Sequence, residues 1–293
     1  MIIVKLIGGL GNQLFQYAFA RSLAITHDVS FKLDISSFDT YKLREYSLMH
    51  FNIIENFASE SELRLVKKNY CEYWKNKLID LLSPYHKKTL IKERKFTYDS
   101  ELINNIDFSK KIIYFEGYWQ TEKYFSLIKN TITKELELKT SIDDENKKHA
   151  ESINRFNSVS IHIRRGDYVH NKNTQKYHGA CGLDYYSKAV EIISSKVTEP
   201  YFFIFSDEPE WVENNLKLKF PTTYIKNNDS SKSHEDLKLM ALCKHNIIAN
   251  STFSWWGAWL NKNNDKIIIS PAKWFQTESI DYSDVIPNGW IKI

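Results

Sequence analysis

Several features that are common in other protein classes are scarce in this 293-residue chain. Nine glycines and six prolines are too few for a collagen-like or linker-rich protein. The three cysteines, Cys71, Cys181 and Cys243, lie far apart without a CxxC pair, which predicts reduced thiols rather than a disulfide framework. No run approaches the roughly 18 apolar residues that span a bilayer, and the start MIIVKLIGG lacks the basic region of a signal peptide. We therefore expect a cytoplasmic protein that contacts the inner face of a membrane at most peripherally.

Metal-binding signatures are also missing. The sequence contains no Asp-x-Asp triplet, and no group of His, Cys and Glu has the spacing of metal ligands. We therefore predict no metal and no other cofactor. If the chain holds a diphosphate, arginine side chains and helix dipoles would neutralise it.

What the chain does contain is apolar and mildly basic. Hydrophobic residues make up 42% and aromatic residues 14%, with a net charge of +4, as in a globular protein rather than a disordered one. The positive charge is concentrated from Arg64 to Lys95, which holds ten Lys and Arg against three Asp and Glu. This segment is either a solvated basic face or a surface that docks on anionic lipids or an anionic acceptor. Nucleic acid is disfavoured as a partner, because no nucleic-acid motif accompanies the charge.

Strand and helix patterns alternate at both ends of the chain. Residues 2–7 form an apolar run of strand length, and glycines and a helical pattern follow before a second strand at 29–36. The middle of the chain is expected to be largely helical, except for a strand near 110–120. Alternation then restarts, with strands expected at 159–165, 201–207, 222–227, 245–250 and 266–271 and with helices between them.

This order predicts an α/β protein with parallel sheets and right-handed crossovers, built as two Rossmann-like domains. The polar segment 134–151 is the expected connection. It divides the chain into an N-terminal domain of residues 1–150 and a C-terminal domain of residues 151–293, whose last residues could pack back on the first domain.

The most informative stretch is His162-Ile163-Arg164-Arg165-Gly166-Asp167, at the end of an expected strand. Ligands of doubly wound sheets bind outside the carboxyl ends of the strands, and two guanidinium groups there could chelate a pyrophosphate. The alternative is a pair of surface arginines, one of them bonded to Asp167. The Arg-Gly-Asp triplet is not expected to act in cell adhesion, since it follows a buried strand.

A glycine turn, GGLGNQ, follows the first strand. It departs from the dinucleotide fingerprint, because Leu14 occupies the third glycine position. Gly9 and Gly11 would still let the backbone approach a ligand, and a helix N-terminus attracts anions. Asn12 is expected either to cap that helix or to hydrogen-bond a ligand.

Polar residues follow other expected strands as well. Ser206 and Asp207 could cap a helix or contact a ligand, and Glu235 could favour its helix dipole or accept hydrogen bonds from guanine. Asn250, Ser251 and Thr252 lie where backbone N–H groups and hydroxyls would receive a phosphate. The nearby tryptophans Trp255, Trp256 and Trp259 are either sugar platforms or core, and their helical spacing favours core.

Taken in order, the motifs GGLGNQLFQYAFARSLA, HIRRGDY, FSDEPEW and HNIIANSTFSWWGAWL resemble the bacterial α-1,2-fucosyltransferases of glycosyltransferase family 11. The resemblance covers residues 1 to about 275. It implies a GT-B fold with two domains facing a central cleft, and metal-free, inverting transfer of fucose from GDP-fucose. It also implies a galactose-containing oligosaccharide or lipid-linked glycan as acceptor, in the synthesis of surface polysaccharide or other glycans. The C-terminal half would bind the nucleotide while the N-terminal half faces the acceptor.

The resemblance also assigns roles to residues. It places the β-phosphate on Arg164 and Arg165 and the turn with Asn12 near the donor sugar. Asp167 is then the first candidate for the catalytic base and His162 the second, while the leaving phosphate could itself accept the proton. Two rival readings remain open: a GT-B transferase for another nucleotide sugar, and a non-catalytic nucleotide- or glycan-binding protein on the same fold.

Overall fold

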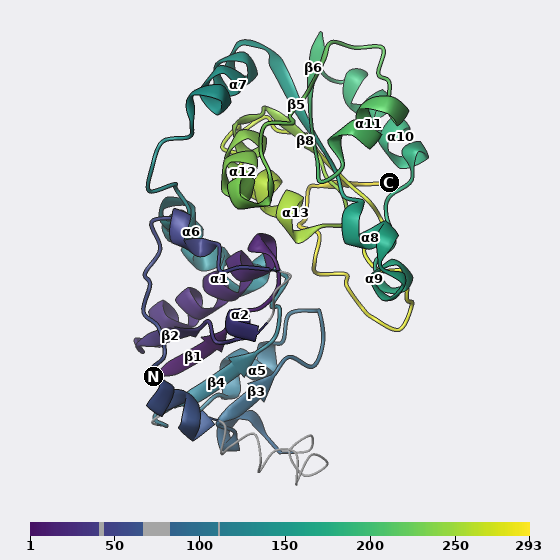
Figure 1. Ribbon diagram of the computed structural model, residues 1–293. Coiled ribbons are helices and arrows are strands. Elements are labelled where there is room, and N and C mark those ends of the chain that lie inside the picture. Colours follow the sequence, from purple (N-terminus) through teal and green to yellow (C-terminus); the bar gives the residue numbers. More distant parts are fainter. Residues whose placement is uncertain (41–43, 67–82, 111) are drawn as a thin grey trace. The chain divides into compact units, whose positions relative to one another are not determined.

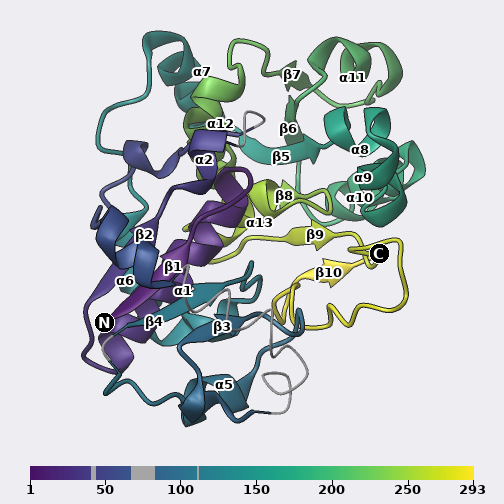
Figure 2. The ribbon, with the colours of Figure 1, turned by 60° about the horizontal axis from the view of Figure 1, so that its bottom comes forward.

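The computed structural model describes residues 1–40, 44–66, 83–110 and 112–293. These residues form two compact units, shown from two directions in Figures 1 and 2. One unit contains Met1–Lys139 and Ser283–Val285, and the other contains Thr140–Tyr282 and Ile286–Ile293. The division after Lys139 lies inside the polar segment 134–151. Within the described ranges, no helix combines the length and the apolar character needed to cross a membrane.

The first unit is built on a four-stranded parallel sheet with the strand order β2-β1-β4-β3 (Figure 1). Its strands are β1 (Ile2–Lys5), β2 (Phe31–Asp34), β3 (Leu90–Lys92) and β4 (Ile113–Glu116). The helices are α1 (Leu10–Thr26), α2 (Ser37–Thr40), α5 (Ser100–Asn105) and α6 (Lys129–Glu135). The strands are short apolar runs, as expected for parallel strands that are covered on both faces. Helix α1 is buried along most of its length, which fixes the glycine turn that precedes it.

The second unit is built on a six-stranded parallel sheet with the order β10-β9-β8-β5-β6-β7 (Figure 2). The strands are β5 (Asn157–Ile163), β6 (Pro200–Ser206), β7 (Thr222–Tyr224), β8 (His245–Ile247), β9 (Ile268–Ser270) and β10 (Ile291–Lys292). Because β5 lies between β6 and β8, its residues 158–163 are all buried. The segments that follow β5, β6 and β8 therefore meet at one edge of the sheet.

Helices connect the strands of the second unit. They are α7 (Asp144–Arg155), α8 (Gly166–His170), α9 (Lys172–Tyr177), α10 (Leu183–Ser194), α11 (Pro209–Asn215), α12 (Ser233–Leu242) and α13 (Thr252–Trp259). The expected helices correspond to α10 to α13, and Trp255, Trp256 and Trp259 are 0%, 0% and 4% exposed. The prediction that these tryptophans belong to the core is confirmed.

Three local differences from the expected elements have clear physical causes. Much of the segment 134–151 is helical, because Asp143 caps α7 by accepting the N–H of Asn146 at 2.8 Å. Strand β3 is only three residues long and is flanked by charged residues, so its sequence carries little periodicity. Helices α8 and α9 are short and polar, and they lack a continuous apolar face.

A return segment, Ser283–Val285, belongs to the first unit although the residues around it belong to the second. The Asp284 carboxylate anchors it there. This carboxylate accepts the backbone N–H of Tyr98 at 2.9 Å and pairs with Lys123 at 2.5 Å.

Candidate functional site

Arg164, which follows β5, is held by two carboxylates. Its Nη2 lies 2.5 Å from Asp167 Oδ1, and its Nη1 lies 3.0 Å from Asp207 Oδ2. Burial disfavours the charge, but the two carboxylates raise the pKa of Arg164 above its ordinary value. The cation is therefore permanent, and carboxylates occupy both of its terminal nitrogens.

Arg165 is held by different groups. Its backbone N–H donates to Asp207 Oδ1 at 2.9 Å, and its Nε donates to Glu208 Oε2 at 2.9 Å. The guanidinium carbon lies 3.3 Å from the centre of the Trp211 ring. Within residues 112–293, no contact engages the terminal Nη atoms of Arg165. A guanidinium presents these N–H groups as a planar fork that matches two phosphate oxygens, so Arg165 is the better placed arginine to meet a phosphate.

Asp207 reaches both arginines because the residue that follows them, the first of α8, is glycine. A Cβ at Gly166 would lie 2.5 Å from Asp207 Oδ2, which is closer than a real side-chain carbon approaches an oxygen. The neighbouring Glu208 binds His170 Nε2 at 2.7 Å as well as Arg165. Although burial opposes it, the bonds from Arg165 and His170 hold the pKa of Glu208 below its ordinary value. Glu208 therefore stays ionised and keeps Arg165 in place.

The two predicted bases occupy different environments. Asp167 is 39% exposed on its side chain and pairs with Arg164. His162 lies inside β5 and is 4% exposed, 5.4 Å from the Phe253 ring. Burial, assisted by the charge of Arg164, lowers the pKa of His162 to about 3, so its ring is neutral and a weak proton acceptor. This favours Asp167 over His162 as the group that could accept a proton.

The segment after β8 combines structural bonds with a helix start. The Asn250 carboxamide donates to the carbonyls of His178, Gly179 and Trp274 at 3.1, 2.9 and 3.2 Å. Its backbone carbonyl accepts the Tyr168 hydroxyl at 3.2 Å, which ties this segment to α8. Ser251 is the N-cap of α13 without a capping bond from its side chain, and Thr252 is the first helical residue. The N–H groups that begin α13 therefore face the same sheet edge as the arginines.

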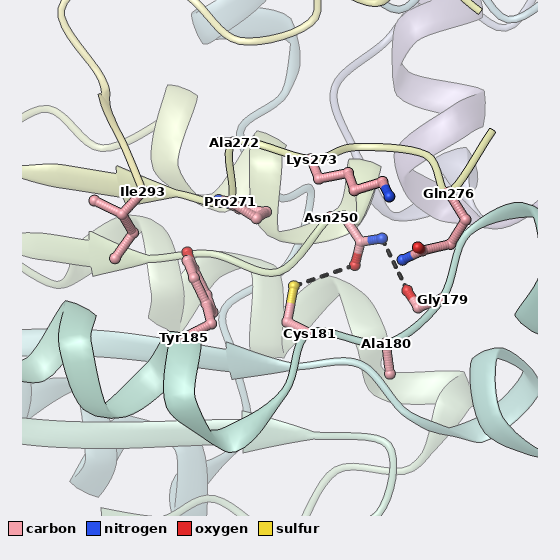
Figure 3. A pocket seen from close by; sticks show the side chains of 10 residues that line it. All are labelled: Gly179, Ala180, Cys181, Tyr185, Asn250, Pro271, Ala272, Lys273, Gln276 and Ile293. Atoms are coloured by element: carbon pink, nitrogen blue, oxygen red, sulfur yellow. Dashed lines mark hydrogen bonds between the residues drawn. The ribbon is translucent and has the colours of Figure 1, made fainter. Parts of the chain in front are cut away.

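A pocket of about 230 Å³ lies beside Asn250, at the ends of β8, β9 and β10 (Figure 3). Figure 3 shows the Asn250 carboxamide between Cys181 and Gly179 on its wall. The other lining residues are Ala180, Tyr185, Pro271, Ala272, Lys273, Gln276 and Ile293. Of the predicted site residues, Asn250 alone lines this pocket.

Ser206 and Glu235 are engaged inside the second unit. The Ser206 hydroxyl accepts the N–H of Glu208 at 3.0 Å, which shapes the turn before α11. Glu235 is 7% exposed and accepts the N–H of Asp143 and the amide of Asn146 at 2.9 and 2.7 Å. These bonds join the starts of α7 and α12, so Glu235 belongs to a structural cluster away from the arginines.

The glycine turn of the first unit is fixed by buried amide side chains that the sequence analysis overlooked. Gln13 donates to the carbonyls of Gly8 and Glu45 at 2.9 and 2.8 Å. Gln16 accepts the N–H of Ile7 at 3.0 Å and donates to the carbonyl of Gly117 at 3.0 Å. Both glutamines are 0% exposed. On α1 the two glutamines are surrounded by apolar residues, so the helical pattern does not single them out as a functional pair.

Asn12 does not cap α1, because Gly9 is the N-cap residue. Asn12 lies in the first turn of the helix, and its Oδ1 accepts Gln120 Nε2 at 3.1 Å. Gly8 has φ +82°, and a Cβ there would lie 2.6 Å from Asn12 Nδ2. Glycine at this position therefore leaves room for the Asn12 carboxamide, which a side chain there would displace. Gly9 and Gly11 lie beside it, at the start of the helix.

The structure thus joins Arg164, Arg165, Asp167 and Asp207 by direct bonds at one sheet edge of the second unit, and Asn250 is linked to the same edge through Tyr168 of α8. It adds Glu208, His170 and Trp211 to that group. These three were not predicted, although Glu208 and Trp211 lie within the FSDEPEW motif. Gly9, Gly11 and Asn12 belong to the other unit, at the end of β1.

Two parallel α/β units, the second with fixed arginines at the carboxyl edge of its sheet, match the GT-B class of fold predicted from the sequence, in which ligands bind outside the strand ends. The model of Glycosyl transferase family 11 matches residues 1–293, and the chain belongs to this family. This confirms the family that the four motifs predicted.

Two bacterial relatives are similar to this chain over nearly its whole length, and a mammalian one is similar over half of it. The chain is 34% identical over 302 residues to an alpha-1,2-colitosyltransferase of Escherichia coli, covering 100% of this chain and 99% of that protein. It is 34% identical over 309 residues to the O-antigen biosynthesis glycosyltransferase WbnK of Escherichia coli, covering 98% of each. A galactoside alpha-(1,2)-fucosyltransferase 2 of Rattus norvegicus is 24% identical over 152 residues, covering 50% of this chain and 43% of that protein.

The fold also matches a solved structure. The crystal structure of the NodZ alpha-1,6-fucosyltransferase soaked with GDP-fucose aligns with a TM-score of 0.51 and 14% identity. The alignment covers 88% of this chain and 92% of that one. The predicted GT-B fold class is confirmed.

Proposed function

We propose that this glycosyltransferase moves L-fucose from GDP-fucose to the 2-hydroxyl of a galactose residue, with inversion at the anomeric carbon. The observation that carries the proposal is the geometry of Arg165. Its guanidinium is fixed on Trp211 and by Glu208, at the end of a parallel strand, beside the permanently charged Arg164. This arrangement is suited to binding a nucleoside diphosphate, because it offers fixed positive charge and a planar pair of donors.

In the proposed reaction, the acceptor hydroxyl attacks the anomeric carbon while the bond to the β-phosphate breaks. Negative charge grows on the departing phosphate, and preorganised donors aimed at such charge commonly supply the largest catalytic contribution. Arg165 would supply the fork, and the N–H groups at the start of α13 would add a partial positive charge. Asp167, at the exposed end of the cluster, is our candidate for the group that accepts the hydroxyl proton. The departing phosphate is the alternative acceptor.

Metal independence belongs to the same proposal. The donors that a divalent cation would otherwise replace are proposed to be the terminal N–H groups of Arg165, which keeps its charge at every physiological pH, and the N–H groups at the start of α13. The acceptor is proposed to be a galactose-containing oligosaccharide or lipid-linked glycan of a surface polysaccharide, as supported by the similarity to an O-antigen biosynthesis enzyme.

A second candidate donor is GDP-colitose. The similarity to an alpha-1,2-colitosyltransferase over the whole chain favours it, whereas the similarity to a galactoside fucosyltransferase covers half of the chain. Colitose is L-fucose without its 3-hydroxyl, so the two donors differ in a single group. A site that hydrogen-bonds this hydroxyl rejects the deoxy donor by about 10⁴-fold or more, whereas a site shaped for the deoxy sugar rejects the hydroxyl by only about 10²-fold.

The test is a panel of GDP-fucose, GDP-colitose, GDP-mannose and UDP-galactose, incubated with lactose or N-acetyllactosamine. Nucleotide release gives kcat/KM for each donor, and NMR of the product gives the linkage and the anomeric configuration. An α-1,2-fucoside with GDP-fucose as the preferred donor is the expected result. Preference for GDP-colitose would show that the second candidate is the donor. Release of UDP would indicate another transferase, and binding without turnover of any donor would indicate a non-catalytic protein.

A further inference from the structure

Glu93 follows β3 at the carboxyl edge of the sheet in the first unit, and it clamps the turn after β4. Its Oε2 accepts the N–H of Tyr118 at 2.7 Å, and its Oε1 accepts the N–H of Trp119 at 3.0 Å. Both carboxylate oxygens are therefore used to hold successive backbone amides of one turn. Burial of the carboxyl group outweighs these two donors and raises the pKa of Glu93 to about 7.

The clamped turn has a strained backbone. Trp119 has φ +56°, in the left-handed region that a bulky residue rarely adopts. Its ring is 1% exposed and stacks on Phe19 of α1, with 4.1 Å between the ring centroids and 5° between the planes. Such strain costs of order 1–3 kcal/mol, persists only where the surroundings enforce it, and is concentrated at functional sites. Here the Glu93 clamp and the Phe19 stack enforce it.

The strained turn directs the next residue onto the glycine turn. Gln120 is 6% exposed, and its Nε2 donates to Asn12 Oδ1 at 3.1 Å. The Gly117 carbonyl, at the other end of the same turn, accepts Gln16 Nε2 at 3.0 Å. The turn after β4 is therefore bonded to α1 at both of its ends, and one of these bonds fixes the side chain of Asn12.

We propose that Glu93 and Gln120 are positioning residues for the transfer reaction, which orient the Asn12 carboxamide through the turn 117–120. Glu93 holds the turn in its strained form, and Gln120 binds the carbonyl oxygen of Asn12, which directs the NH₂ group of Asn12 away from Gln120. The inference rests on the proposed function and on the expectation, implied by the family resemblance, that the Asn12 turn lies near the donor sugar. It adds two residues, one after β3 and one after β4, that none of the four sequence motifs contains.

The test is a double-mutant cycle with Gln120→Leu, Glu93→Gln and Asn12→Ala, each alone and in pairs with Asn12→Ala. Gln120→Leu keeps the volume but removes the donor. Glu93→Gln can accept only one of the two N–H groups. Either change alone should lower kcat about tenfold with little change in the KM for the donor, because one buried hydrogen bond that orients Asn12 is lost. In the Asn12→Ala background the same changes should alter kcat less than about twofold.

The matched control is Tyr85→Phe, which removes a hydrogen bond of 2.8 Å to the buried carboxylate of Asp99 in the same unit. It should lower the melting temperature without lowering kcat. Gln120→Asn, which withdraws the amide from Asn12 by one carbon, replaces Gln120→Leu if that variant does not fold. Equal losses of kcat with and without Asn12 would overturn the inference, as would a loss for Tyr85→Phe as large as that for Gln120→Leu.

Turnover of the donor panel by the wild type distinguishes a failure of this inference from a failure of the proposed function. If wild type turns over a donor of the panel and the cycle shows no coupling, the inference alone is wrong. If wild type turns over none of the donors, the proposed function is wrong and the inference is rejected with it.

Discussion

Replacing Arg165 with lysine tests the group on which the proposed function depends. Lysine keeps the charge but presents one ammonium where the guanidinium presents a planar pair of N–H groups. One charge-assisted hydrogen bond contributes about 1.5–3 kcal/mol, which corresponds to about 10- to 150-fold in rate. Lysine also loses the bond from Nε to Glu208 at 2.9 Å and the stacking on Trp211 at 3.3 Å, which together fix the position of the charge. We therefore expect kcat/KM to fall on the order of 10²-fold.

The assay is steady-state release of GDP, measured beside a thermal melt. Arg155→Lys is the matched control. Arg155 is an exposed arginine of the same unit that also lies over an aromatic ring, 5.7 Å from the centre of Phe156. It precedes β5, whereas Arg165 follows it, so its replacement should leave kcat/KM unchanged. If Arg165→Lys runs at the rate of Arg155→Lys, or if it unfolds, Arg165 is a structural residue and the reasoning fails.

Four further predictions concern the same chain. Asp167→Asn should lower kcat by about 10² or more at a nearly constant KM if Asp167 accepts the proton, whereas a rise in KM alone would mean that it only orients Arg164. Excess EDTA should leave GDP release unchanged, and a loss that Mg²⁺ or Mn²⁺ restores would refute metal independence. Since the pKa of Glu93 rises from 4.5 to about 7 on folding, its contribution to stability is present below about pH 4.5 and lost as pH approaches 7. Urea unfolding should therefore show Glu93→Gln gaining stability relative to wild type between about pH 5 and pH 8. Finally, the chain should co-sediment with anionic liposomes at low salt and not at high salt, and a failure to bind at low salt would leave the solvated-face interpretation.

Within the basic segment from Arg64 to Lys95, residues 67–82 lie outside the described residues. The described cations of this segment have different partners. Arg64 pairs with Glu60 at 3.1 Å on the surface, Lys92 pairs with Glu116 at 3.2 Å, and Arg94 lies over the Tyr85 ring at 4.9 Å. Contact with a membrane therefore stays a prediction, and the liposome experiment decides it.

The parts of the fold and site that could be predicted from sequence are those encoded by local patterns. The alternation of Val159, Ile161 and Ile163 with polar residues indicates a strand, and residues that follow a strand of a parallel sheet must lie at its carboxyl edge. That reasoning places Arg164 and Arg165 correctly at the edge of the sheet. The spacing of Trp255, Trp256 and Trp259 likewise indicates a buried helix face.

The other features depend on contacts between residues far apart in the chain. Glu93 and Trp119 meet because β3 and β4 are neighbours in the sheet, and nothing in either local sequence encodes the strained turn. Glu208 looks like one more acidic residue before a helix until its bond to Arg165 is seen. Gln13 and Gln16 are polar residues in an apolar helix, a local conflict that is typical of functional or tightly constrained sites. This conflict is the one signal that could have identified them from sequence.

The return segment Ser283–Val285 makes the first unit discontinuous in the sequence. The chain passes between the units three times: after Lys139, before Ser283 and after Val285.

The first unit is therefore not one continuous stretch of sequence. Asp284, from near the end of the chain, binds Tyr98 and Lys123 of that unit, so a fragment that ends at Lys139 would lack part of its own fold.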